Sequence, residues 1–229
     1  MYKLVRLLVY ALLLQTLSAF ADDVPVQREF EPRGGKGPAL VLVSGQSGPG
    51  NYIELAKDLA GEGFYVVLID GNDFWIKGGG GERLLRDVIQ RAQQSSHSLK
   101  GKVGVIGCSL GGASALTYAA RMPEMVSAVI AHYPLTSFIS DAPDFVGRIR
   151  VPTLVLAGTF DTYKSCCLIE TARRLEEAAK AGPDPRMFQL HEYRGVDHGF
   201  STDGSKRRDV RSDSIRRSIE FLHQHFDTS

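Results

Sequence analysis

Cysteine is scarce in this sequence of 229 residues, which contains three: Cys108 and the adjacent pair Cys166 and Cys167. So few cysteines exclude a small domain held together by a disulfide framework. Neighbouring cysteines rarely bridge each other, because the ring strains the peptide bond between them. The pair could therefore be packing residues, or one member could bond to Cys108, and the sequence leaves both options open.

The sequence also lacks an excess of charge of either sign. Its 27 Lys and Arg residues nearly balance 26 Asp and Glu residues, which gives a formal charge of +1. Such a balance indicates neither a nucleic-acid partner nor an anionic membrane surface. The basic stretch KRRDVRSDSIRR at 206–217 is interrupted by acids at helical spacing, which predicts a solvated helix face rather than a binding patch.

No apolar run reaches the roughly 20 residues that a membrane-spanning helix needs. The run Leu7–Leu17 follows two basic residues and precedes the small-residue pattern Ala-Phe-Ala at 19–21. This order is typical of a cleavable secretory signal peptide. We expect cleavage after Ala21 and a secreted or periplasmic protein with one domain over 22–229. No association with a membrane is expected after cleavage.

A nucleotide-binding loop is missing as well. The glycine-rich segments Ser44–Gly50 and Gly78–Gly81 both lack the pattern G-x-x-x-x-G-K-[ST] that cradles phosphates. A mobile loop is the better interpretation of the second segment.

What the sequence does contain is an alternation of apolar runs with amphipathic stretches. The apolar runs are nearly continuous, as expected for parallel strands covered on both faces. They span Leu40–Val43, Phe64–Ile69, Val103–Ile106, Val126–Ala131, Thr153–Ala157 and Met187–Tyr193, with a further edge strand near Val24–Glu31. Helical patterns lie at about 52–61, 82–94, 110–121, 165–181 and 207–226. The alternation predicts an α/β fold with a mostly parallel central sheet, helices on both faces, and ligands beyond the carboxyl ends of the strands.

One predicted strand leads into GCSLGG, which offers two adjacent nucleophiles, Cys108 and Ser109. The segment fits G-x-S-x-G, in which a strained strand-to-helix turn exposes the central side chain. A side chain at either flanking position would collide with the turn, so glycine is needed there. Centring the motif on Ser109 places Gly107 and Gly111 at the flanks, whereas centring it on Cys108 would not. Ser109 is therefore the predicted nucleophile and Cys108 a buried neighbour.

A serine nucleophile needs a base, and the loop after the last strand supplies His198 in YRGVDHGF. His223 and His225 lie on the predicted terminal helix and are expected at the surface. His132 ends a strand beside the Ser109 strand, where it could line the pocket or, as we favour, lie in the core. His198 is the predicted base.

The acid should follow the strand between these two, and VPTLVLAGTFD places Asp161 there. A carboxylate at that position can orient the imidazole and stabilise its protonated form. Asp197 is the rival, but an acid adjacent to its own histidine rarely reaches the far ring nitrogen. Asp161 could also be a simple turn residue that caps the following helix.

Two backbone N–H groups should hold the oxyanion that forms during attack. One is expected from Leu110, the residue after the nucleophile. The other is expected from Gln46, because it follows Gly45, which lets the loop turn toward the elbow.

With these motifs together, the sequence resembles the dienelactone hydrolase family of the α/β-hydrolase fold over roughly residues 38–226. GCSLGG, VPTLVLAGTFD and YRGVDHGF carry the resemblance. Dienelactone hydrolases proper have cysteine at the elbow, whereas Ser109 stands there in this chain. Ser44 also replaces a histidine that relatives often carry. The resemblance thus implies a serine esterase-like activity more than the hydrolysis of dienelactone itself.

The expected protein is a secreted serine hydrolase that cleaves ester or lactone bonds through an acyl-enzyme intermediate. Its partner is a small-molecule ester or lactone, and neither a metal nor an organic cofactor is expected. About 20 residues with three prolines join the predicted strands at 126–131 and 153–157, which disfavours a large lid. An acyltransferase with the same residues and a non-catalytic binding protein of this fold stay open as alternatives.

Overall fold

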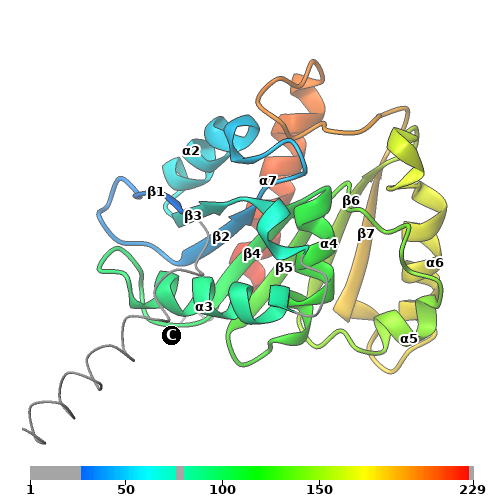
Figure 1. Ribbon diagram of the computed structural model, residues 1–229, viewed down its shortest axis with the longest axis horizontal. Coiled ribbons are helices and arrows are strands. Elements are labelled where there is room, and N and C mark those ends of the chain that lie inside the picture. Colours follow the sequence, from blue (N-terminus) through cyan, green and yellow to red (C-terminus); the bar gives the residue numbers. More distant parts are fainter. Residues whose placement is uncertain (1–26, 76–79, 227–229) are drawn as a thin grey trace, which may run out of the picture.

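A seven-stranded sheet in the order β1-β3-β2-β4-β5-β6-β7 forms the centre of the computed structural model, which describes residues 27–75 and 80–226 (Figure 1). Every neighbouring pair of strands is parallel except β1 and β3. The strands are β1 (Arg28–Phe30), β2 (Ala39–Val43), β3 (Tyr65–Ile69), β4 (Val103–Cys108), β5 (Val126–His132), β6 (Thr153–Gly158) and β7 (Phe188–Tyr193). The predicted mostly parallel α/β fold is confirmed, and the edge strand predicted near Val24–Glu31 corresponds to the short β1, which pairs antiparallel with β3.

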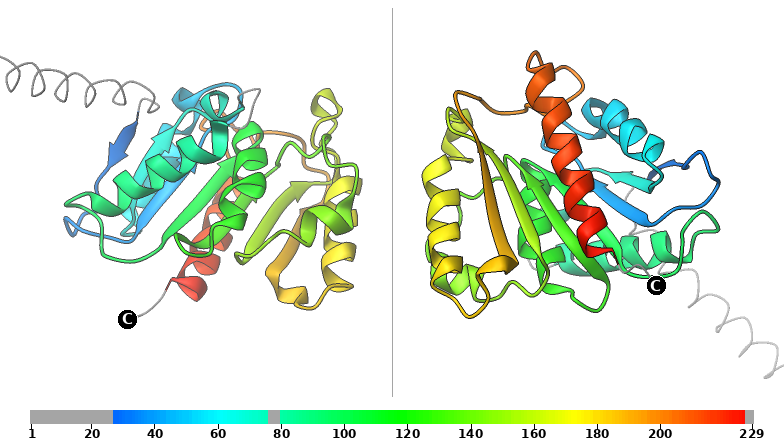
Figure 2. Two further views of the ribbon diagram at one scale, coloured as in Figure 1. Left: turned by 60° about the horizontal axis from the view of Figure 1, so that its bottom comes forward. Right: turned by 180° about the vertical axis from the view of Figure 1, so that it is seen from behind.

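Helices cover both faces of this sheet, and Figure 2 shows α7 crossing the rear face with α2 beside it. The α-helices are α2 (Ile53–Gly61), α3 (Gly80–Gln94), α4 (Leu110–Thr117), α5 (Ala142–Val146), α6 (Ile169–Lys180) and α7 (Arg208–His225). Short 3₁₀ turns occur at η1 (Pro49–Tyr52), η2 (Gly71–Phe74), η3 (Ala119–Arg121), η4 (Tyr163–Ser165) and η5 (Pro185–Met187). No helix in the described parts of the chain has the length and apolar character needed to cross a bilayer.

Alternate residues of each strand feed two separate apolar cores, because successive strand side chains point to opposite faces. In β2, Val41 and Val43 pack into the core that includes α3 and α6 residues. Leu40 and Leu42 pack into the core that includes α2 and α7 residues. All five β2 residues are buried, so the strand reads as a continuous apolar run.

The structure departs from the predicted elements in four places. The helix predicted over 165–181 begins only at Ile169, and the one predicted over 110–121 ends at Thr117. Gly80 and Gly81 open α3 instead of belonging to a loop, and the rest of the predicted mobile segment lies outside the described residues, as does the predicted signal peptide. Between β5 and β6 the short helix α5 is added, which has a proline in its first turn. Within residues 27–75 and 80–226, no large lid covers the sheet.

Candidate active site

Ser109 sits in a sharp turn between β4 and α4, with φ 52° and ψ −112°. This left-handed conformation is strained for a residue with a side chain and persists only where the surroundings enforce it. The backbone N–H of Ser109 donates to the carbonyl of His132 at 3.0 Å, which fixes one side of the turn. A Cβ on Gly107 would overlap the Gly111 carbonyl, and one on Gly111 would overlap the Val43 carbonyl. The flanking glycines are thus required by close packing, as expected.

Three side chains from three loops form a hydrogen-bonded chain at the carboxyl edge of the sheet. His198 Nε2 lies 3.0 Å from Ser109 Oγ, and His198 Nδ1 lies 2.7 Å from Asp161 Oδ2. The Asp161 side chain is 1% exposed and that of His198 is 17% exposed. The carboxylate is thus shielded from water, the imidazole is partly accessible, and Ser109 is 7% exposed. Such an arrangement can move a proton from the hydroxyl to the imidazole.

Asp161 also acts locally, since its Oδ1 accepts a hydrogen bond from the Tyr163 backbone N–H at 3.2 Å. It is therefore a turn-capping residue and the partner of His198 at once. Asp197, the rival acid, is exposed. The geometry favours Asp161 over Asp197 as the residue that orients His198.

Both residues expected to donate to an oxyanion belong to segments near Ser109. Leu110 follows it in the chain, and Gln46 belongs to a loop that approaches it in space. Leu110 is the first residue of α4, and the first N–H groups of a helix have no acceptor within it. A Cβ built on Gly45 would lie 3.1 Å from the Ser109 Cβ, so the loop that carries Gln46 approaches the nucleophile closely. The Gln46 side chain points elsewhere, accepting from Lys164 Nζ at 3.4 Å. Any role of Gln46 here would therefore fall to its backbone.

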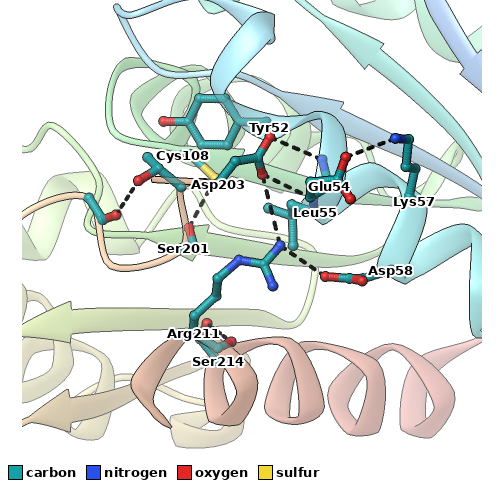
Figure 3. Close-up of polar contacts among 12 residues, drawn as sticks. Tyr52, Glu54, Leu55, Lys57, Asp58, Cys108, Ser201, Asp203, Arg211 and Ser214 are labelled. Carbon is teal, nitrogen blue, oxygen red and sulfur yellow. Dashed lines mark hydrogen bonds and ion pairs between the residues drawn. The ribbon is translucent and has the colours of Figure 1, made fainter. Parts of the chain in front are cut away.

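Cys108, the other half of the adjacent pair, is fully buried. Its Sγ lies 3.8 Å from the Ser201 hydroxyl, a contact shown in Figure 3. Burial raises the pKa of the Cys108 thiol to about 12, and the hydrogen bonds of Ser201 and Tyr133 only partly offset this rise. The expected burial of Cys108 is confirmed, and its thiol is a poor nucleophile.

The side chains of the remaining candidate histidines take no part in this hydrogen-bonded chain. His132 is completely buried, and its Nε2 is 2.9 Å from the Ser218 hydroxyl of α7. Burial lowers the pKa of His132 to about 3, so the ring stays neutral. His132 is thus a core residue, as favoured from the sequence. His223 is exposed on α7 and His225 is partly buried there.

Sequence reasoning missed two tyrosines that hold the His198 ring. Tyr163 stacks on it with centroids 4.6 Å apart and planes 10° apart. Tyr133 presents its edge from 4.8 Å at 67°. Tyr163 follows Asp161 by two residues, so its place in the same loop was the available signal. The stacked ring limits how far His198 can rotate.

The loop that carries Tyr163 ends in a disulfide between Cys166 and Cys167. The expectation that adjacent cysteines do not bridge is therefore wrong for this chain, and no bond forms to Cys108, which is free. The carbonyl of Cys166 accepts backbone N–H groups from Thr136 at 2.8 Å and Ser137 at 3.0 Å. These bonds tie the loop after β6 to the loop after β5. The two cysteines five and six positions after the predicted acid were the sequence signal for this feature.

Sequence reasoning also missed Asp203, which anchors the loop that follows His198. Its carboxylate accepts the backbone N–H groups of Glu54 at 3.0 Å and Leu55 at 3.3 Å, in the first turn of α2 (Figure 3). Arg211 of α7 lies 2.9 Å from Asp58 and 3.9 Å from Asp203. A residue about 150 positions away in sequence thus caps α2 and fixes the histidine loop to it.

An open pocket of about 600 Å³ adjoins His198. Its lining includes the exposed ring of Phe160 and the basic residues Lys206 and Arg207. This volume lies within the range of roughly 300–1,000 Å³ that holds small organic ligands.

Comparisons with known proteins agree with this fold. A family model described as the dienelactone hydrolase family matches residues 76–226. A search of curated proteins found no match. A solved structure assigned as a dienelactone hydrolase from Klebsiella pneumoniae has a TM-score of 0.70 at 19% identity and covers 86% of this chain and 92% of its own.

Two further solved structures share the fold. Paleococcus ferrophilus monoacylglycerol lipase has a TM-score of 0.65 at 18% identity, covering 88% of this chain and 99% of its own. Thermogutta terrifontis esterase 2, phosphoramylated by tabun, has a TM-score of 0.68 at 16% identity, covering 89% and 91%.

Proposed function

Because the chain belongs to the dienelactone hydrolase family, we propose that it is a secreted serine hydrolase that cleaves ester or lactone bonds through an acyl-enzyme intermediate. The observation that carries the proposal is the chain of contacts from Ser109 Oγ to His198 at 3.0 Å and on to Asp161 at 2.7 Å. A serine hydroxyl is a weak nucleophile unless a base takes its proton, and His198 is within reach of that proton.

In the first half of the reaction, Ser109 Oγ attacks the carbonyl carbon while His198 Nε2 accepts the hydroxyl proton. Asp161 holds the Nδ1–H and stabilises the imidazolium. The carbonyl oxygen becomes an oxyanion, which the backbone N–H groups of Leu110 and Gln46 bind. His198 then protonates the leaving alkoxide, and the acyl group stays on Ser109.

In the second half, water attacks the acyl-enzyme with His198 as the base, and Ser109 is released. The partial exposure of His198 supports water as the acceptor, because no large lid within the described residues separates the imidazole from solvent. An acyltransferase would need to exclude water in favour of an alcohol or amine. Hydrolysis is thus the simpler outcome for this open site.

The choice of esters and lactones is supported by the solved structures that share the fold, among them an esterase and a monoacylglycerol lipase. Serine at the elbow supports the same choice. The pocket beside His198 has the volume to hold a small substrate.

Hydrolysis of aryl esters, alkyl esters and lactones by the purified wild type and Ser109→Ala tests the proposal. We expect turnover of at least one class by the wild type and none above background for Ser109→Ala. A wild type with no activity on any of these substrates would favour the non-catalytic binding protein. Equal activity of both proteins would remove Ser109 from the mechanism.

Export belongs to the proposal too, and the segment 1–21 supports it by its order of basic, apolar and small residues. Expression of the full chain followed by N-terminal sequencing of the exported protein should give Asp22 as the first residue. A protein that keeps Met1 and stays with the cells would contradict export by cleavage.

A further inference from the structure

Two sulfur atoms and an imidazole nitrogen lie close together beside the candidate nucleophile. One ligand atom each from Cys166, Cys167 and His198 lies within 4.8 Å of the other two. Both cysteines are buried, at 9% and 4% exposure. The proposed hydrolysis uses His198 but assigns no task to the two cysteines.

The spacing of these atoms is close to that of ligands around one soft cation. Zinc binds thiolate sulfur at about 2.3 Å and imidazole nitrogen at about 2.0–2.1 Å in a tetrahedron, so its ligand atoms are separated by roughly 3.3–3.8 Å. Breaking the bond between Cys166 and Cys167 lets the sulfurs move apart toward that separation. Small shifts would thus complete the geometry.

His198 is also oriented as metal-binding histidines are. Such a histidine usually gives its second ring N–H to a carboxylate, which fixes the tautomer and raises the basicity of the free nitrogen. Asp161 Oδ2 lies 2.7 Å from His198 Nδ1 and fills that position. The nitrogen left for a cation is Nε2, which faces Ser109 Oγ.

The loop between Asp161 and the disulfide is held in conformations that most residues avoid. Lys164 and Ser165 both have positive φ, of 46° and 53°. Side chains rarely adopt this region, so these residues depend on the contacts around them. The disulfide closes the loop directly after them, and its loss frees a segment that is strained already.

From these observations we propose that reduction of the Cys166–Cys167 disulfide creates a site for a soft divalent cation such as zinc or cadmium. Its ligands are the two thiolates and His198 Nε2. A dithiol supplies two electrons and two protons, becomes a disulfide itself, and leaves two cysteine thiols. Binding of the cation then releases both thiol protons to solvent, because thiolate is the form that binds metal.

The oxidised protein should not hold the ion, since disulfide sulfurs carry no thiolate charge. The bound ion would occupy the nitrogen that accepts the Ser109 proton, so it would also stop hydrolysis. That consequence rests on the proposed function, whereas the binding of the cation does not. The two can therefore be tested separately.

The binding test is a titration with cadmium, followed by the ultraviolet charge-transfer band of cadmium thiolates. The protein is reduced with a phosphine, freed of reductant without air, and compared with its oxidised form. We expect one equivalent to bind to the reduced protein and none to the oxidised one. Cys108→Ser should behave as wild type, and the double variant Cys166→Ser/Cys167→Ser should show no band.

The role of His198 as a ligand is tested by the affinity of variants for cadmium. Asp161→Asn should weaken cadmium binding by about 10- to 100-fold, and His198→Ala by at least as much. His223→Ala, which removes an exposed histidine of α7, is the matched control and should change nothing. Equal affinities of the His198 and His223 variants would overturn the proposal, as would equal binding by both redox forms. Circular dichroism that shows the reduced protein to be unfolded would overturn it too, because the site needs the folded loop.

Ester hydrolysis supplies the second measurement. One equivalent of cadmium should lower the activity of the reduced wild type at least about tenfold, reversibly with a chelator, and leave the oxidised enzyme unaffected. Ser109→Ala should still bind cadmium in its reduced form. If no form hydrolyses esters, the proposed function fails while the titration still decides the cation site. Binding without inhibition would overturn Nε2 as the ligand.

Discussion

Ser109 combines a strained backbone with a side chain held at 3.0 Å from His198. The strain persists because the glycines on both sides let β4, α4 and the end of β2 pack against the turn without clashes. A residue forced into this conformation projects its side chain out of the turn and toward the imidazole. Single residues in this site should therefore have large and separable effects on turnover.

The two acids near His198 provide the clearest test at this scale. Asp161→Asn should lower kcat by on the order of 10³- to 10⁶-fold while the protein stays folded, because the amide favours the wrong imidazole tautomer and no longer stabilises the imidazolium. Asp197→Asn, which alters an exposed carboxylate, is the control and should keep turnover within a few-fold of wild type. Steady-state hydrolysis of an aryl ester measures both. The opposite ranking would transfer the orienting role to Asp197.

Cys108 should contribute to packing alone. Cys108→Ala removes a small, fully buried group and should lower the free energy of unfolding by about 1 kcal/mol, with kcat nearly unchanged. Denaturant unfolding and an ester assay measure the two effects. Rapid alkylation of Cys108 by iodoacetamide with parallel loss of activity would contradict its assignment as an inert neighbour.

At the level of residues, sequence reasoning was informative where short-range steric rules apply. The demand for glycine on both sides of a tight turn identified Ser109 over Cys108, and the burial of Cys108 agrees with that choice. The disulfide between Cys166 and Cys167 could not be predicted in this way. Local strain argues against it, and the bonds that hold Cys166 in place come from Thr136 and Ser137 in another loop.

Among the elements, strands were predicted better than helix ends. Buried parallel strands read as continuous apolar runs, and each run matched a strand to within a residue or two. The start of α6 was missed because the residue pattern does not reveal the positive φ of Lys164 and Ser165 or the disulfide that follows them. The cap on α2 was missed because Asp203 comes from a loop about 150 residues away.

The cap on α2 joins this helix to the loop that follows His198. Asp203→Ala should lower the free energy of unfolding by about 1–2 kcal/mol, since two N–H groups of α2 lose their acceptor. Asp209→Ala is the matched control, because Asp209 is exposed and pairs with Arg207, and its loss should cost clearly less than that of Asp203. Thermal and urea unfolding of the two variants measure these losses of stability. Equal losses would show that Asp203 does not act as a cap.

A shift of the histidine loop would accompany the loss of this cap. His198 lies five residues before Asp203, so Asp203→Ala should also lower kcat, by more than Asp209→Ala does. The effect should be far smaller than that of Asp161→Asn, because the groups that react are all retained.

Across the whole molecule, the pH dependence of stability should reflect the buried His132. Its pKa is lowered to about 3 by burial, against 6.5 in an unfolded chain. Above pH 6.5 the ring is neutral in both the folded and the unfolded state. In that range His132 contributes no pH dependence to the free energy of unfolding. Between pH 6.5 and 3 only the unfolded state binds the proton, so stability falls as the pH falls, by up to about 1.4 kcal/mol per pH unit.

His132→Gln removes this titration and isolates it from the other groups. The variant should be less stable than wild type at pH 7, because it loses a packed ring, but the difference should shrink by about 2 kcal/mol at pH 5. Urea unfolding at both pH values measures this change. A difference that stays constant would mean that His132 titrates alike in the folded and unfolded states.

The fold as a whole explains why the candidate site assembles at one edge. In parallel strands the carboxyl ends lie together, so the loops after β2, β4, β6 and β7 meet there although they are far apart in sequence. This rule let the sequence predict which loops carry Ser109, Asp161 and His198. It could not predict Tyr163 stacked on His198, because that contact depends on a loop conformation with no regular pattern.

The central claim is that Ser109 is the residue that becomes acylated, and one measurement addresses it directly. The protein is treated with a fluorophosphonate probe, digested, and analysed by mass spectrometry to locate the modified residue. We predict a single adduct on Ser109 in wild type, none in Ser109→Ala and little in His198→Ala. An adduct on Cys108, or equal labelling of wild type and Ser109→Ala, would contradict the account.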